Sequence, residues 1–258
     1  MPTLMIEIMD QPILVAVISF ATMWFAAWVG AAFRRSKWHM QDQDREDFGL
    51  IVGAALTLLG LIIGFSFSMA INRYDQRKNY EEAEANAIGT EYVRADLLPG
   101  EDAAKVKGLL RSYLDQRIDF YRVHNSSELQ QIGAATGQIQ ADLWNAVRVP
   151  ADAKPTPVVA LAVAGMNDVL NSQGYTQAAW WNRIPIAAWE LMGAIAVCCN
   201  LLIGFYVRRV TAHNARFFVL PLIVAISFLL IADIDSPRGG LIHVRPQNLV
   251  ALSSSVSR

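Results

Sequence analysis

The chain has 258 residues, of which 53% are hydrophobic and only 17% are charged. Soluble proteins carry about 25% charged residues, so this composition argues against a single soluble domain and against a disordered chain. The net charge is −1, from 22 basic and 23 acidic residues, which argues against nucleic-acid binding through a basic surface. The two cysteines, Cys198 and Cys199, are adjacent and cannot form a disulfide framework.

Four apolar stretches are long enough to cross a membrane as α-helices, which need about 20 residues. They cover residues 12–33, 48–71, 186–207 and 217–234. Residues 1–11 contain Glu7 and Asp10 but no Lys or Arg, so we expect the first stretch to be a membrane span rather than a cleavable signal peptide. The pattern therefore predicts two spans near each end of the chain.

Between the second and third spans lies a polar region with a helical pattern. Apolar residues recur there at helical spacing, for example at Val106, Leu110 and Leu114, and no strand-like alternation interrupts them. We therefore predict an all-α integral membrane protein with four transmembrane helices and a helical domain inserted between helices 2 and 3. Its expected parts are a transmembrane hairpin at 1–72, a helical extramembrane domain at 73–185, and a second transmembrane hairpin with a short C-terminal tail at 186–258.

Lys and Arg near the spans predict the orientation, because short loops rich in these residues stay in the cytoplasm. They are Arg34, Arg35, Lys37 and Arg45 in the first short loop and Arg208, Arg209 and Arg216 in the second. This places loops 34–47 and 208–216 in the cytoplasm, and both termini and the central domain on the other side. Arg73 and Arg77 argue against this orientation, and we interpret them as partners of nearby acids such as Glu81.

The second span carries the most specific pattern in the chain. Small and polar residues recur at spacings of three and four, so they share one face of the helix. They are Gly53, Thr57, Gly60, Gly64, Ser68 and Asn72. The interpretation we favour is close helix packing, in which small side chains let two backbones approach. The alternative is that this face forms the wall of a water-filled or ion-conducting path. In an oligomer the face can pack against a helix at one depth of the membrane and line a path at another.

Acidic residues at the end of the fourth span are a second candidate feature. The interpretation we favour places Asp233 and Asp235 at the membrane rim, where they would pair with residues such as Arg183 and Arg238. The alternative is a ring of these carboxylates around an oligomer axis. The four histidines are scattered, and the sequence has no HExxH, GxSxG or Walker lysine motif. We therefore expect no enzyme, no metal and no cofactor.

One block of the sequence is similar to a known family. It comprises residues 64–70 (GFSFSMA), 73–77 (RYDQR), 84–92 (EANAIGTEY), 94–99 (RADLLP) and, near the C-terminus, 231–242 (IADIDSPRGGLI). These residues resemble the bacterial membrane proteins grouped as DUF4239, also called bestrophin-like, whose function is unknown. The resemblance implies the bacterial inner membrane and a relation to pentameric anion channels with a cytoplasmic soluble domain. The neck and selectivity sequences of true bestrophins are not found here.

Polar and charged residues within this block follow the second span out of the membrane. Arg73 and Arg77 lie one helical turn apart, and Asn86, Thr90 and Arg94 continue a polar line at intervals of four residues. Such a line could bond to a second helix or gather anions at a pore mouth. The complete set of candidate ion or partner contacts is Arg73, Asp75, Arg77, Glu84, Asn86, Thr90, Arg94, Asp233 and Asp235.

Two functions are consistent with these patterns. The one we favour from the sequence is a homo-oligomeric, non-conducting membrane scaffold or sensor whose helical domain binds a partner. The alternative is an oligomeric, bestrophin-like channel for small ions, with anions as the first candidate. The two differ in whether Gly60, Gly64 and Ser68 contact helices of the same chain or face an oligomer axis.

Overall fold

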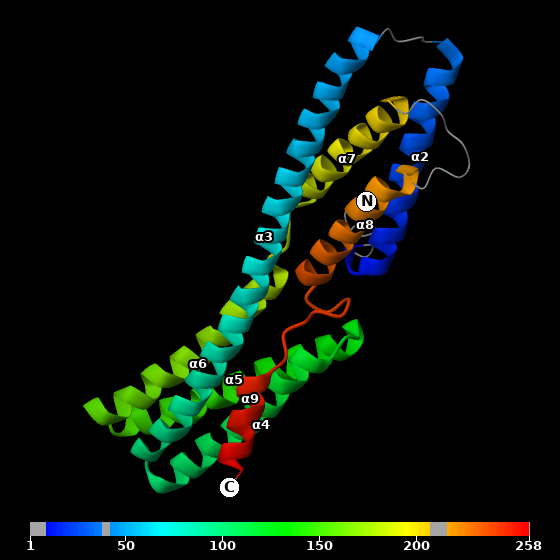
Figure 1. Ribbon diagram of the computed structural model, residues 1–258. Helices are drawn as coiled ribbons and strands as arrows, with labels where there is room; N and C mark the ends of the chain where they lie inside the picture. The colour runs from blue at the N-terminus through cyan, green and yellow to red at the C-terminus, as the bar shows by residue number, and fades with distance from the viewer. Residues whose placement is uncertain (1–8, 38–41, 207–215, 258) are drawn as a thin grey trace. The chain divides into compact units, whose positions relative to one another are not determined.

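The computed structural model describes residues 9–37, 42–206 and 216–257, and the side chains of 34–46 and 207–217 lie outside this description (Figure 1). The basic side chains used to predict the orientation all fall within these two ranges. The elements are α2 (Pro12–Lys37), α3 (Asp42–Arg94), the short 3-10 helix η1 (Ala95–Leu97), α4 (Gly100–Arg122), α5 (Ser126–Ala153), α6 (Pro157–Trp181), α7 (Ile186–Tyr206), α8 (Arg216–Asp235) and α9 (Gln247–Val256). The described residues contain helices and no strand, which confirms the all-α prediction.

Four helical segments among the described residues are long and apolar enough to cross a membrane. They are Pro12–Phe33, Asp47–Leu97, Pro157–Tyr206 and Phe218–Asp235. The second and third are 51 and 50 residues long, more than twice the length that a bilayer requires, and the third comprises both α6 and α7. The prediction of four apolar spans is therefore confirmed, and the extra length of α3 extends into the polar region, as the sequence indicated.

The chain divides into two compact units. The membrane unit consists of residues 1–73 and 183–243, and the helical unit consists of residues 74–182 and 244–258. Helix α3 contributes to both. The segment that we expected to be a short tail contains α9, which belongs to the helical unit and which the sequence analysis did not predict.

Within the membrane unit, α2 packs against α7 and α8. The backbones of α2 and α7 approach closely, because a Cβ atom at Gly30 would collide with the carbonyl oxygen of Leu201 and one at Gly204 would collide with that of Ala27. Small residues permit such an approach between membrane helices. This intrachain small-residue contact therefore joins α2 and α7, a pair that the sequence analysis did not single out.

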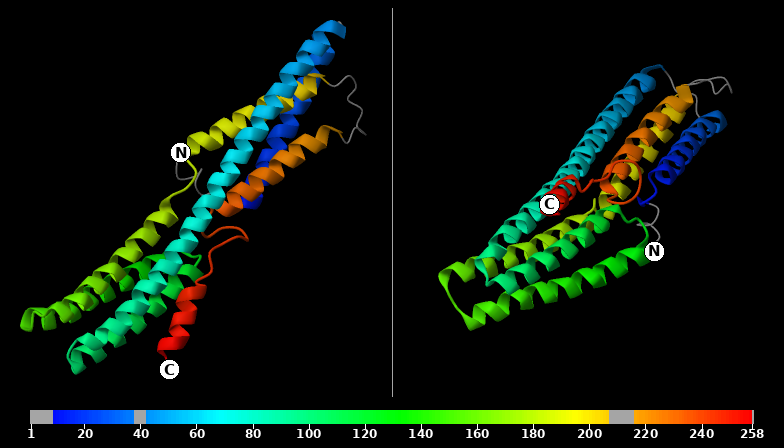
Figure 2. Two further views of the ribbon diagram at one scale, coloured as in Figure 1. Left: turned by 60° about the vertical axis from the view of Figure 1, so that its left-hand side comes forward. Right: turned by 90° about the horizontal axis from the view of Figure 1, so that it is seen from below.

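The helical unit is built around α4, α5 and α6, which run alongside one another in both views of Figure 2. Its core contains the predicted stripe of α4, with Val106, Leu110 and Leu114 almost fully buried. Two helices begin at side-chain caps: the Asn125 carboxamide accepts from the Ser127 amide at 3.0 Å, and the Thr156 hydroxyl accepts from the Val159 amide at 3.2 Å. Such caps are worth about 1 kcal/mol each and set the first turns of α5 and α6.

Candidate functional site

The small and polar face of α3 is open in the single chain. All six of its predicted members are exposed, namely Gly53, Thr57, Gly60, Gly64, Ser68 and Asn72. A Cβ atom at any of the three glycines would meet no described atom within 4 Å. The Thr57 hydroxyl donates to the carbonyl of Gly53 at 2.9 Å, so its hydrogen bond stays within the helix. Among the described residues, no helix of the same chain covers this face at the glycines.

The open face continues along α3 beyond the apolar segment. Asp75, Asn86 and Thr90 are exposed, as predicted for candidate contacts, and Arg73 and Arg94 are half-buried. The Arg73 guanidinium donates to the Met69 sulfur at 3.7 Å, one turn back along the helix. Of these candidates, Asp75, Asn86 and Thr90 are therefore the ones that lie on the surface of the single chain.

Glu84 and Arg77, two further candidate contacts, are buried inside the helical unit. Glu84 is 0% exposed, and its carboxylate forms an ion pair with Arg117 of α4, which is 1% exposed. Tyr121 and Thr176 donate to the same carboxylate at 3.4 and 3.2 Å. Arg77 donates to the carbonyl of Ala179 at 3.4 Å. Both side chains therefore bond within the chain and are not presented on its surface.

Three side chains around Glu84 have raised pKa values, namely Arg117, Tyr113 and Tyr121. Burial is the largest single influence and opposes the charged form of Arg117, but Glu84, Tyr113 and Tyr121 together outweigh it and raise the pKa of the guanidinium. Burial, with a contribution from Glu84, raises the pKa of Tyr113 and Tyr121 well above the ordinary tyrosine value. The ion pair and hydrogen bonds of the Glu84 carboxylate therefore join α3, α4 and α6.

Asp233 and Asp235 accept hydrogen bonds from backbone amides of the membrane unit. Asp233 accepts from Leu241 at 2.7 Å and from Ile242 at 3.0 Å, and Asp235 accepts from Ile184 at 3.1 Å. The two carboxylates are 8% and 5% exposed. Their bonds tie chain segments together at the end of α8, and neither aspartate is presented on the surface of the single chain.

The turn after α8 explains the glycines of the sequence motif. Gly240 has φ 79°, a backbone conformation that favours glycine, and a Cβ atom there would collide with the Asp233 carboxylate. Nearby, Asp10 forms an ion pair with Arg183 and accepts from the Ser236 hydroxyl at 2.8 Å. The motif at 231–242 therefore encodes a fixed turn beside the start of α2.

A scan against family models matches residues 17–249 to the Bestrophin-like domain. The chain belongs to the bestrophin-like family. This confirms the resemblance given by the sequence blocks, while the narrower DUF4239 grouping stays a prediction. A search of the curated proteins finds no match.

Solved structures show the same bestrophin-like fold. A bacterial bestrophin homologue from Klebsiella pneumoniae with a leucine-to-threonine mutation has a TM-score of 0.60 at 13% identity, covering 96% of each chain. The form of that homologue with an aspartate-to-alanine mutation has a TM-score of 0.60 at 16% identity, covering 95% of this chain and 96% of that one. The form phased with zinc has a TM-score of 0.59 at 16% identity, with the same coverage.

Glu81 holds α9 in this bestrophin-like chain, a role that the sequence analysis missed. Its carboxylate accepts from the backbone amides of Asn248 and Leu249 at 2.9 and 3.0 Å and from the Asn248 side chain at 2.6 Å. A carboxylate at a helix N-terminus satisfies unpaired amides and complements the helix dipole. At the other end, Arg111 donates to the carbonyl of Val256 at 3.0 Å, so α9 is held at both ends.

One sequence signal could have identified these buried acids. Glu81, Glu84 and Glu91 lie at helical spacing on the face of α3 that also carries the buried apolar residues Ala85 and Ile88. Acidic residues within an apolar stripe are costly unless they are paired or neutral. The stripe therefore indicated buried acids, although their partners lie too far away in the sequence to be read from it.

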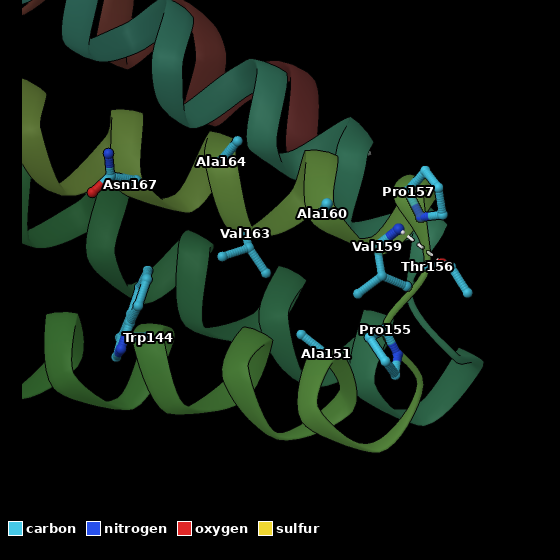
Figure 3. A pocket seen from close by; sticks show the side chains of 10 residues that line it. All are labelled: Trp144, Ala151, Pro155, Thr156, Pro157, Val159, Ala160, Val163, Ala164 and Asn167. Atoms are coloured by element: carbon cyan, nitrogen blue, oxygen red, sulfur yellow. Dashed lines mark hydrogen bonds between the residues drawn. The ribbon is translucent and has the colours of Figure 1, made fainter.

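The helical unit also has a shallow groove between α5 and α6, of about 610 Å³ (Figure 3). Its lining residues are Trp144, Ala151, Pro155, Thr156, Pro157, Val159, Ala160, Val163, Ala164 and Asn167. The lining contains no acid, base or nucleophile beyond the Thr156 hydroxyl, which caps α6. Across the described residues, no group of three metal-binding side chains occurs either. Neither feature indicates catalysis.

Proposed function

We propose that this bestrophin-like chain forms a homo-oligomeric ion channel in the bacterial inner membrane, with the small and polar face of α3 lining the path. The observation that carries the proposal is the open face of α3 at Gly53, Gly60 and Gly64. Membership of the bestrophin-like family supports the channel rather than the scaffold or sensor that the sequence alone favoured.

The composition of α3 supports this arrangement. Leu58 and Phe65 are exposed about 100–120° around the helix from Gly64 and suit contact with lipid, whereas Thr57 and Ser68 do not. Lipid tails offer polar side chains no hydrogen bonds, so the small polar face is better placed against water or other subunits. Copies arranged around a rotation axis would provide both neighbours.

We further propose that the membrane unit crosses the bilayer and that the helical unit lies outside it, as the predicted division at 72/73 and 185/186 implies. Asn86 and Thr90 would then extend the path beyond the membrane. The lining is mostly uncharged, so the permeant species would be small inorganic ions, with selectivity set near Asp75, which is exposed about three turns beyond Gly64 on the same face.

The direct test is ion flux by the purified full chain in liposomes. The size of the assembly in detergent is measured by light scattering in parallel, and flux is followed with ion-sensitive dyes under chloride, sodium and potassium gradients. We expect an oligomer that conducts. A well-folded oligomer without flux under any gradient would overturn the channel proposal in favour of a scaffold or sensor.

Orientation is a separate prediction, made from the charges of the short loops. Alkaline phosphatase fused near Gly100 is expected to be active, because the helical unit would lie outside the cytoplasm, and a fusion near Asp42 is expected to be inactive. The reverse pattern would place the helical unit in the cytoplasm, as the family resemblance implies. Each outcome leaves the proposed path along α3 unchanged.

A further inference from the structure

Glu91 of α3 is a buried acid that lacks the partners its neighbours have. Its side chain is 0% exposed, and neither carboxyl oxygen has a hydrogen-bond partner among the described residues. The other two buried glutamates of this helix face, Glu81 and Glu84, each accept three or more hydrogen bonds. A buried and unpaired carboxylate is among the most unfavourable groups in a protein interior, so the protonation state of Glu91 requires an explanation.

Helix α6 closes directly over this carboxyl group. A Cβ atom at Gly165 would collide with Oε2 of Glu91 and would lie 2.7 Å from Nη1 of Arg94. The two side chains thus occupy the space that a larger residue at 165 would need. The charged groups that act on Glu91 are Arg94, from its own helix, and Asp168, from α6.

These surroundings favour the neutral acid. Burial is the main cause that raises the pKa of Glu91 from 4.5 to about 8; Arg94 opposes this effect and Asp168 adds to it. In the closed unit the carboxyl group therefore keeps its proton at neutral pH. In an opened unit, where water reaches the side chain, the proton is released above the ordinary glutamate pKa.

We propose that Glu91 is a proton-binding site that controls the closure of α6 on α3. With the proton bound, the neutral carboxyl group fits beneath Gly165 and α6 stays closed. When the proton is lost to solvent, an unpaired charge is left in the interior, and α6 must open to hydrate it. The site concerns the helical unit alone and does not depend on whether the chain conducts ions.

The sign of the pH dependence follows from linkage. Because the pKa of Glu91 is raised in the closed state, its protonation stabilises closure. This contribution to the free energy of closure is complete below about pH 4.5 and is lost as the pH rises towards 8. Within this window the opening equilibrium of α6 increases by up to about tenfold for each pH unit, and it levels off above the raised pKa.

The test is hydrogen exchange of α6 peptides in the full chain in detergent, between pH 6 and 9 and corrected for intrinsic exchange. We expect opening in the parent protein to increase with pH up to about 8, whereas Glu91→Gln, which mimics the neutral acid, stays closed throughout. The matched control is Glu82→Gln, an exposed acid of the same helix, which should behave like the parent.

A second variant separates proton binding from a purely structural role. Asp168→Asn removes a negative charge that raises the pKa of Glu91, so opening should level off at a lower pH than in the parent. A parent protein whose α6 exchange is independent of pH would overturn the proposal. So would pH dependence that persists in Glu91→Gln, because another group would then be responsible.

Discussion

Replacing Gly64 with leucine is expected to reduce ion flux by about tenfold or more while the protein still folds, because a ring of leucines would form a hydrophobic constriction in the path. Gly64 can take this side chain without a clash inside its own chain, since nothing described lies within 4 Å of its Cβ position. Flux into liposomes, normalised to the amount of reconstituted protein, measures the effect.

The control for this variant is Leu58→Phe, which enlarges an exposed apolar residue about 120° away around the same helix. It should leave the flux near that of the parent protein. Equal flux from the two variants would show that α3 does not line the path at Gly64. Loss of the oligomer in Gly64→Leu alone would instead identify the face as a packing interface between subunits.

The second large effect is expected at the buried ion pair of the helical unit. Arg117→Met leaves the Glu84 carboxylate buried without its cation, which should lower the free energy of unfolding by about 3–5 kcal/mol. Replacing both partners, as in Glu84→Leu with Arg117→Met, should recover much of this loss because no uncompensated charge is left. Chemical unfolding of the full chain in detergent, followed by tryptophan fluorescence, measures both.

An exposed ion pair provides the comparison for Arg117. Arg148 and Asp152 of α5 pair at 3.1 Å with exposed side chains, so Arg148→Met should change the stability little. A similar loss of unfolding free energy in Arg117→Met and Arg148→Met would show that burial does not increase the contribution of the Glu84–Arg117 pair to stability. A large loss in the double variant would show that Tyr121 and Thr176, rather than Arg117, depend on the carboxylate.

The parts of the fold that follow from local sequence could be predicted. Runs of about 20 apolar residues identified the spans, and helical spacing identified the buried stripe of α4. Contacts between distant residues could not be predicted, because no local pattern links Gly30 to Gly204 or Glu81 to Asn248. Helix α9 was missed for the same reason, since its polar serines resemble a tail and its position depends on Glu81.

The candidate site was predictable in part. The face of α3 followed from spacing alone, but its exposure could be learned only from the arrangement of the other helices. Asp233 was singled out because it is charged at the end of an apolar segment, and Glu84 because it belongs to the block that resembles the family; the structure gives each a partner in the same chain. The sequence shows that such a charged residue needs a partner. Only the structure shows whether that partner lies within the chain, in which case the role of the residue is structural.

The contact between Glu81 and α9 also has a consequence for biosynthesis. Residues 81 and 248 are 167 positions apart, and α7 and α8 lie between them in the chain. At about 5–20 residues per second, the ribosome makes Asn248 roughly ten to thirty seconds after Glu81. During that interval the Glu81 carboxylate has no donors from α9. The helical unit can therefore be completed only after the last membrane hairpin has been synthesised.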